Sequence, residues 1–143
     1  MPTIERTVRT DQPLDKVFAY LSNFTNAEQW DAGTVSCRRT EGDGGVGSVY
    51  QNTSRFLGRE TRLEYTVLAV DPQRRFQLRG VNKTVTSLDT MELSPYGDGT
   101  EIRYTAEFEF SGVSKYLAPL LAPALKKLGD GAQEGLQREL ARL

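Results

Sequence analysis

Asp89 is the residue whose type and position most favour chemistry. It lies in residues 84–93, where apolar and polar side chains alternate with the period of a β-strand. Because Met91 and Leu93 share its side of that strand, the pattern points the Asp89 carboxylate toward the core. A carboxylate in the core is costly unless it is paired or has a function, so Asp89 is a candidate for proton transfer. A salt bridge, or a strand end open to water, would explain the same pattern.

Three tyrosines are predicted to face the same side of the sheet as Asp89. They are Tyr50, which shares a row with Asn52, Tyr65 and Tyr104. Aromatic walls with a few convergent polar groups are typical of a pocket for an oxygenated apolar molecule. A tyrosine could polarise a carbonyl group, and Asp89 with a raised pKa could move a proton, so Asp89, Tyr65 and Tyr104 are the catalytic candidates. The alternative is that the tyrosines are core residues whose hydroxyls reach the rim.

The composition removes several common kinds of site. The 143 residues contain no histidine and one cysteine, Cys37. This excludes the Ser-His-Asp and Cys-His arrangements and nearly all zinc sites, and we expect neither a metal nor a cofactor. Cys37 can form no intrachain disulfide and is predicted to be a small half-buried side chain rather than a nucleophile. Any catalysis must use carboxylates, tyrosine, lysine, arginine or bound water.

The charges are balanced and dispersed, with 18 basic and 19 acidic residues and a net charge of −1. No basic stripe interleaves with aromatic residues, so nucleic acid is not an expected partner. No apolar run approaches 18 residues and no signal peptide is recognisable, which predicts no transmembrane helix and a cytoplasmic location. The length predicts one domain over residues 1–143. The oligomeric state stays open.

Residues 42–47 match the G-x-G-x-x-G pattern of a dinucleotide-binding loop but lack its context. Such a loop follows a buried strand and opens a helix, so that helix amides meet the pyrophosphate. Here the preceding run contains Arg38 and Arg39. The following run, residues 48–56, is rich in β-branched and aromatic residues and has no helical period. The glycines are therefore interpreted as a turn between two strands.

The remaining patterns predict the elements that must position these residues. Residues 3–9 alternate like a strand, Pro13 opens a short amphipathic helix, and a second short helix follows at residues 23–30. The period then changes from 3.6 to 2, and short connections rich in turn residues imply antiparallel neighbours. Six further strands are predicted at residues 35–40, 48–55, 59–70, 76–82, 84–93 and 101–110.

From about residue 113 to residue 143, leucine and alanine recur on one face of a predicted helix. About 25 helical residues would span roughly 37 Å, enough to cross a whole domain. Pro119 and Pro123 should delay its start or kink it. Gly131 and Gly135 fall near the apolar stripe, where they leave room for close sheet contact or for a ligand. This helix is the only element long enough to cover the apolar face of a seven-stranded sheet.

The order of elements resembles the helix-grip fold, also called the START or Bet v 1-like fold. Residues 41–48 resemble the glycine-rich loop of plant Bet v 1 proteins, which also joins strands two and three. Residues 13–23 with Trp30, and further matches at residues 67–76 and 91–100, resemble bacterial polyketide cyclase/dehydrase-like proteins of the SRPBCC superfamily. The resemblance implies an α+β domain in which a seven-stranded antiparallel sheet wraps around the long C-terminal helix, with two short helices after the first strand.

The resemblance also implies a cavity between the sheet and the C-terminal helix. This fold carries several functions and cannot choose among them. We expect a binder or carrier of a small hydrophobic molecule, such as a lipid, isoprenoid or polyketide. The alternatives are an enzyme of polyketide cyclase or dehydratase type that uses tyrosine or Asp89, and an interaction domain with a filled core. A cavity well below about 300 Å³ would count against both ligand-based functions.

The implied cavity and the strand parity together nominate the ligand-binding residues. Trp30 either seals the edge at the short helices or stands at the cavity mouth, and Asp31 beside it is expected to be exposed. The full predicted set is Trp30, Tyr50, Asn52, Tyr65, Asp89, Met91, Tyr104, Phe108, Leu117, Leu121 and Leu125.

Overall fold

The computed structural model describes residues 2–112, 116 and 118–143. Within them lies one antiparallel sheet of seven strands in the order β1-β7-β6-β5-β4-β3-β2. The strands are β1 (Thr3–Thr10), β2 (Thr34–Glu41), β3 (Val49–Phe56), β4 (Arg59–Asp71), β5 (Arg75–Val81), β6 (Val85–Tyr96) and β7 (Gly99–Phe110). The predicted strands are confirmed, and their ends differ from the prediction by three residues or fewer.

The helices follow the predicted order with two differences in detail. The predicted second short helix is a 3-10 turn, η1 (Phe24–Asn26), followed by one α-helical turn, α2 (Ala27–Trp30), after α1 (Leu14–Ser22). Near the C-terminus a 3-10 helix, η2 (Ala118–Leu121), precedes α4 (Ala122–Leu140). Proline lacks a backbone N–H and is tolerated in the first turn, so Pro123 lies there and the long helix starts late, as predicted.

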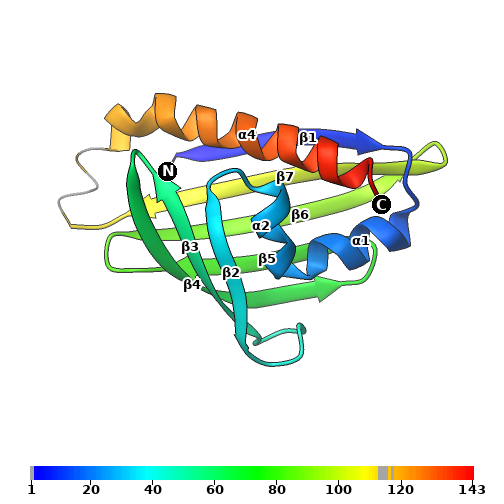
Figure 1. The fold of residues 1–143 in the computed structure, drawn as a ribbon, viewed down its shortest axis with the longest axis horizontal. Coiled ribbons are helices and arrows are strands. Elements are labelled where there is room, and N and C mark those ends of the chain that lie inside the picture. Colours follow the sequence, from blue (N-terminus) through cyan, green and yellow to red (C-terminus); the bar gives the residue numbers. More distant parts are fainter. Residues whose placement is uncertain (1, 113–115, 117) are drawn as a thin grey trace.

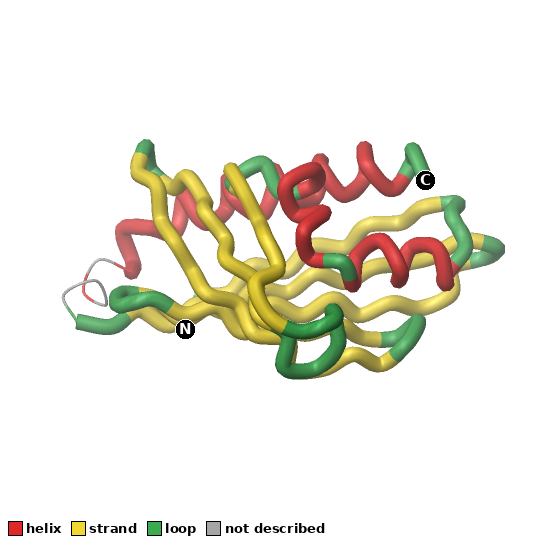
Figure 2. The backbone as a smooth tube through the Cα atoms, turned by 60° about the horizontal axis from the view of Figure 1, so that its bottom comes forward, coloured by secondary structure: helices red, strands yellow, loops and turns green. Residues whose placement is uncertain are grey.

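The sheet bends around α4, which lies along β1 and faces the concave side (Figures 1 and 2). Register shifts between β2 and β3 and between β4 and β5 mark bulges, which increase the local bend and twist of strands. Ile102, Tyr104 and Ala106 of β7 are buried on the concave face, as the alternation predicted. No helix among the described residues has the length and apolar character needed to cross a membrane.

The glycine-rich segment between β2 and β3 is a strand-to-strand turn, as predicted. Gly42 and Gly44 have φ values of +82° and +102°, a region that L side chains rarely adopt. A side chain at Gly42 would also overlap Ser48, whose hydroxyl accepts a hydrogen bond of 2.8 Å from the Gly44 N–H. Because β3 follows directly and no helix begins here, the segment lacks the geometry of a dinucleotide-binding loop.

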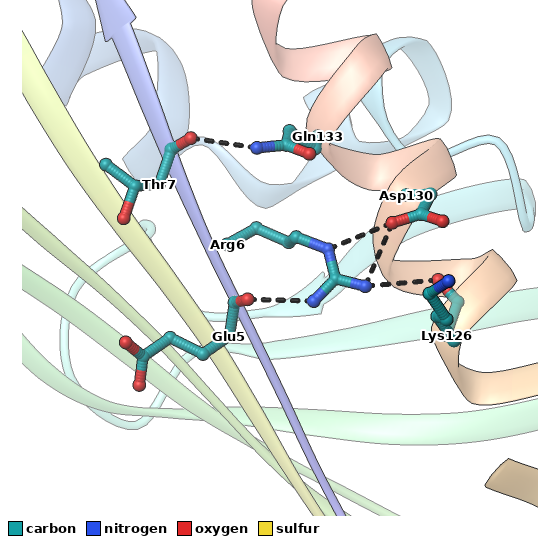
Figure 3. Close-up of polar contacts among 6 residues, drawn as sticks. All are labelled: Glu5, Arg6, Thr7, Lys126, Asp130 and Gln133. Atoms are coloured by element: carbon teal, nitrogen blue, oxygen red, sulfur yellow. Dashed lines mark hydrogen bonds and ion pairs between the residues drawn. The ribbon is translucent and has the colours of Figure 1, made fainter.

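Polar contacts fix α4 to the edge strand β1 (Figure 3). The Arg6 guanidinium donates hydrogen bonds of 3.2 and 3.0 Å to the Asp130 carboxylate and one of 3.3 Å to the Lys126 carbonyl. One turn further along, the Gln133 amide donates a 3.0 Å bond to the Thr7 carbonyl. These contacts set the rotation of α4, so that its apolar side faces the sheet.

Close backbone packing holds the other side of α4 against α2. Gly135 is buried, and a Cβ added there would overlap the carbonyl oxygen of Trp30. Gly129 packs closely against β1 instead, because a Cβ added there would lie 2.5 Å from a side-chain carbon of Ile4. Gly131, which was also expected near the apolar stripe, is half-buried, and a Cβ there would meet only Ala32, at 3.5 Å. Gly135 therefore sets how closely the helix approaches α2.

We expect Gly135→Ala to lower the free energy of unfolding by about 2 kcal/mol or more, on the order of the larger overpacking penalties, because a backbone carbonyl cannot move aside cheaply. Gly131→Ala is the matched control, and it should raise that free energy by up to about 1 kcal/mol, the helix preference of alanine over glycine. Urea unfolding of both variants measures the difference. Equal effects of the two substitutions would show that the contact with Trp30 does not limit the packing.

Candidate ligand-binding site

A cavity of about 110 Å³ lies between the concave face of the sheet and α4. Its wall is built by β3, β4, β6 and β7 on the sheet side and by Leu125, Leu128 and Ala132 on the helix side. The exposed Arg55 belongs to the lining, so the cavity reaches the surface beside β3. The volume is well below about 300 Å³, which counts against both ligand-based functions, carriage of a whole lipid or polyketide and catalysis on one.

Aromatic side chains explain why the cavity is smaller than expected. The Trp30 ring packs edge-on against Tyr104, with ring centroids 5.7 Å apart. Phe24 packs against Tyr50 at 5.7 Å and against Tyr65 at 4.9 Å. These rings fill the part of the interior next to α2, and Tyr65 and Tyr104 also border the hollow. The volume of this hollow is close to that of a cavity that holds one benzene molecule.

Asp89 points into the core, as the strand parity predicted, and its side chain borders the cavity. The Ser87 hydroxyl donates a hydrogen bond of 2.5 Å to one carboxylate oxygen, and the Tyr104 hydroxyl donates one of 3.4 Å to the other. Asp89 pairs in register with Leu78 and Ala106, both apolar. Within the described part of the chain, no basic group lies within 4.0 Å of the carboxylate, so the salt-bridge alternative has no support there.

Burial raises the pKa of Asp89 to about 7. The hydrogen bond from Ser87 opposes the increase, the negative charge of Asp31 adds to it, and the hydrogen bond from Tyr104 again opposes it. A carboxyl group with this pKa is present in both its protonated and its ionised forms at neutral pH. It can therefore give or take a proton under physiological conditions.

Asp31 also lines the cavity, which corrects the expectation that it is exposed. Its carboxylate accepts hydrogen bonds of 3.1 Å from the Gly33 N–H and 3.0 Å from the Thr34 hydroxyl. This Asx-type turn between α2 and β2 draws the side chain inward. The residue is half-buried, and burial raises the pKa of its carboxyl group despite the two hydrogen bonds. The Asp-x-Gly-Thr pattern is the signal in the sequence that would have placed it.

Tyr65 and Tyr104 form the aromatic wall beside Asp89. The ring of Tyr65 lies directly over Gly80 of β5, where an added Cβ would come within 2.6 Å of ring atoms. The Tyr65 ring can lie there because Gly80 has no side chain. Glycine is common in strands where another group approaches the backbone closely. Burial first, and then the nearby charge of Asp89, raise the pKa of both phenols well above the ordinary value. Both hydroxyls stay protonated and can donate hydrogen bonds.

The structure brings some of the predicted ligand-binding residues to the cavity and leaves others away from it. Leu117 lies outside the described residues, so its place is not known. The residues of the predicted set that border the cavity are Tyr65, Asp89, Tyr104, Phe108 and Leu125. Contact of these residues with a ligand stays a prediction.

The rest of the predicted set lies within the described chain but does not border this cavity. Trp30 and Tyr50 are fully buried, and the Trp30 Nε1 and the Tyr50 hydroxyl have no described hydrogen-bond partner. The Asn52 side-chain amide makes hydrogen bonds within the sheet: its oxygen accepts one from Ser54 and its nitrogen donates one to Thr34. Two further apolar residues pack in or against the core, namely Met91 and Leu121.

Several lining residues were not predicted as ligand contacts. Phe56 continues the inward row of Ser54 on β3, and Val85 continues that of Asp89 on β6. Leu128 and Ala132 belong to the apolar stripe of the C-terminal helix. Strand parity and helical spacing would have found all four as inward residues, but neither pattern says which inward residues meet a hollow.

The chemistry available at the cavity is that of carboxyl groups and phenols. Among the described residues, no group of three or more histidine, cysteine, aspartate or glutamate side chains is placed to hold a metal ion. Cys37 is buried, more deeply than the half-burial predicted, and burial raises its pKa to about 12. It is a thiol at neutral pH and not an activated nucleophile.

A family described as "Polyketide cyclase / dehydrase and lipid transport" matches the chain over residues 1–143. Among solved structures, the Zhui aromatase/cyclase from Streptomyces sp. R1128 is similar, with a TM-score of 0.83 and 16% identity over 99% of this chain and 94% of that chain. TTHA0849 from Thermus thermophilus also has a TM-score of 0.83, with 14% identity over 99% of this chain and 98% of that chain. Ara h 8.0201 has a TM-score of 0.73, with 16% identity over 99% of both chains. At these identities the structures share the fold, and no curated protein matches in sequence.

We expect Asp89→Asn to change how stability depends on pH. The folded state keeps the Asp89 proton between the ordinary pKa of 3.8 and about 7, whereas the unfolded chain loses it. The contribution of Asp89 to the free energy of unfolding therefore falls as the pH rises through this window. The variant should be more stable than the natural protein at pH 8, by on the order of a few kcal/mol, and should lose this advantage at pH 5.

Urea unfolding at pH 5 and pH 8 measures the effect, with Asp98→Asn in the exposed turn between β6 and β7 as the matched control. The control should follow the natural protein at both pH values. An Asp89→Asn protein with the pH dependence of the natural protein would show that Asp89 titrates normally.

Proposed function

We propose that this chain, which belongs to the polyketide cyclase / dehydrase and lipid transport family, binds a small and largely apolar molecule between its sheet and α4. The observation that carries the proposal is the cavity itself, with an aromatic wall and the buried, hydrogen-bonded carboxyl group of Asp89. Apolar walls with few but well-placed polar groups are the usual composition of a small-molecule site.

The way the interior is filled supports a binding function. The hollow is not forced by the fold as a whole, because another part of the same interior is filled by Trp30, Tyr50 and Phe24. A hollow beside a buried carboxyl group that has no ion-pair partner among the described residues is the arrangement expected of a binding site.

The volume restricts the ligand. One aromatic ring, or an aliphatic group of about that size, fills the enclosed space. A whole lipid or polyketide is larger than this volume. Only one end of such a molecule would enter, and the rest would extend out of the opening beside Arg55. The small volume counts against both ligand-based functions for a whole lipid or polyketide and agrees with a largely filled core, so the proposal is confined to a ring-sized molecule or group.

We expect Ala132→Leu to abolish binding of a ring-sized molecule, because the larger side chain occupies the hollow. The natural protein should bind toluene, with amide NMR shifts concentrated in β4, β6, β7 and α4. Ala132→Leu should weaken this binding at least tenfold without lowering the free energy of unfolding. Ala122→Leu, at an exposed position of the same helix, is the control and should bind toluene normally. Undiminished binding by Ala132→Leu would place the site elsewhere.

Native mass spectrometry of freshly purified protein complements the titration. A co-purified molecule that is released on unfolding would identify the ligand class directly. Its absence from Ala132→Leu, prepared in parallel, would tie the molecule to the cavity. Retention of the same molecule by Ala132→Leu would contradict the proposed site.

A second candidate function is catalysis of proton transfer next to a carbonyl group. It is favoured by the Asp89 pKa of about 7 and by the neutral Tyr65 and Tyr104 hydroxyls at the same cavity. In this function the Asp89 carboxylate takes a proton from the carbon beside the carbonyl. A tyrosine hydroxyl then donates a hydrogen bond to the oxygen on which negative charge develops. The fold is shared with an aromatase/cyclase.

The enzyme function predicts that the protein accelerates exchange of the methyl protons of acetophenone for deuterium in D2O. The rate should rise with pH through about 7, as Asp89 ionises. Asp89→Asn should abolish the acceleration, whereas Asp98→Asn should keep it. Proton NMR of the ketone measures the exchange, and acceleration that survives in Asp89→Asn would remove Asp89 from the mechanism.

A further inference from the structure

We infer that the cavity binds an organic cation, a protonated amine attached to an apolar body of about one ring. The inference rests on the proposed binding function and specifies the class of ligand. It comes from two carboxyl groups that border the hollow from separate elements and have no ion-pair partner among residues 2–112, 116 and 118–143. Asp31 enters from the turn between α2 and β2, and Asp89 enters from β6.

Among the described residues, the titratable groups that interact with Asp89 are acids. Asp31, Tyr65 and Tyr104 interact with it electrostatically or by hydrogen bonding, and each becomes more negative on ionisation. Opposite these groups, α4 contributes only Leu125, Leu128, Gly129 and Ala132, which carry no charge. A positive charge in the hollow would therefore be attracted from two directions and repelled from none of these walls.

Two described basic residues at the margin of the cavity, Arg55 and Arg6, bond to other groups. Arg55, which lines the opening, has an exposed side chain and lies 3.9 Å from the Glu60 carboxylate. Arg6, whose guanidinium lies near Gly129, is bonded to Asp130 and to the Lys126 carbonyl. Neither forms an ion pair with Asp31 or Asp89. A buried carboxylate without a basic partner is costly, and a cationic ligand would relieve that cost.

The rest of the wall favours an organic rather than a metallic cation. Two carboxyl groups fall short of the six to eight oxygen ligands that Ca²⁺ takes. Tyr65, Tyr104 and Phe108 line the hollow, and the faces of aromatic rings attract ammonium groups. The aliphatic side chains of α4 would cover an apolar body at the same time. An ammonium group on a ring-sized hydrocarbon matches both parts of the wall.

Three probes of nearly equal size test the inference. Benzylamine is a cation at neutral pH, benzyl alcohol is neutral and benzoate is an anion. NMR titrations of the natural protein at pH 8 should give at least tenfold tighter binding for benzylamine than for benzyl alcohol, and the weakest binding for benzoate. Between pH 6 and pH 8, benzylamine affinity should rise about tenfold as Asp89 ionises, while benzyl alcohol affinity should stay within about threefold.

Two variants locate the effect. Asp89→Asn should weaken benzylamine binding at pH 8 at least tenfold and should leave benzyl alcohol binding within about threefold. Asp31→Asn should weaken benzylamine binding in the same direction, because Asp31 shares the cavity wall. Asp98→Asn, which removes one negative charge from an exposed turn, should bind all three probes like the natural protein.

The outcomes separate this inference from the proposed function. If benzyl alcohol or benzoate binds as tightly as benzylamine and Ala132→Leu removes that binding, the cavity is a ligand site but not a cation site. Benzylamine binding that is equal in Asp89→Asn and the natural protein would also overturn the inference. If neither these probes nor toluene shifts the amides around the cavity, the proposed binding function fails together with it.

Discussion

A single helix must cover the concave face of a seven-stranded sheet, and the other features of the structure depend on how that helix is seated. Three contacts hold it in place. Arg6 and Gln133 tie α4 to the edge strand β1, and Gly135 lets the helix backbone meet the carbonyl of Trp30. Because these contacts fix the height of α4 above the sheet, they also decide how much of the interior side chains can fill.

The two halves of that interior are used differently. Beneath α1 and α2, aromatic rings pack edge to face and leave a solid core. Toward the other end a hollow remains, and the small residues Gly129 and Ala132 of α4 form part of its wall. Asp89 is thus buried in a region that is not closely packed. Burial raises its pKa to about 7, and its side chain borders the adjoining hollow.

The sequence predicted most of the fold because the periodic patterns are strong and the turns are short. The parity of β6, β4 and β7 placed Asp89, Tyr65 and Tyr104 on one face correctly. It failed to separate cavity from core, because parity assigns a side of the sheet and not a position along it. Tyr50 shares that side and is fully buried away from the hollow. Asp31 was placed wrongly because its inward orientation depends on a local turn and not on a period.

The sequence by itself determined the element order, the antiparallel pairing and the inward faces, since these follow from the period and from the spacing of turn residues. Only the tertiary structure decided that the cavity is about 110 Å³, and that Asp31 and Asp89 both line it. The size of a hollow is the small difference between the space that the bent sheet encloses and the volume of the side chains that enter it. That difference depends on contacts between residues far apart in the chain, such as Gly135 with Trp30, which no local pattern records.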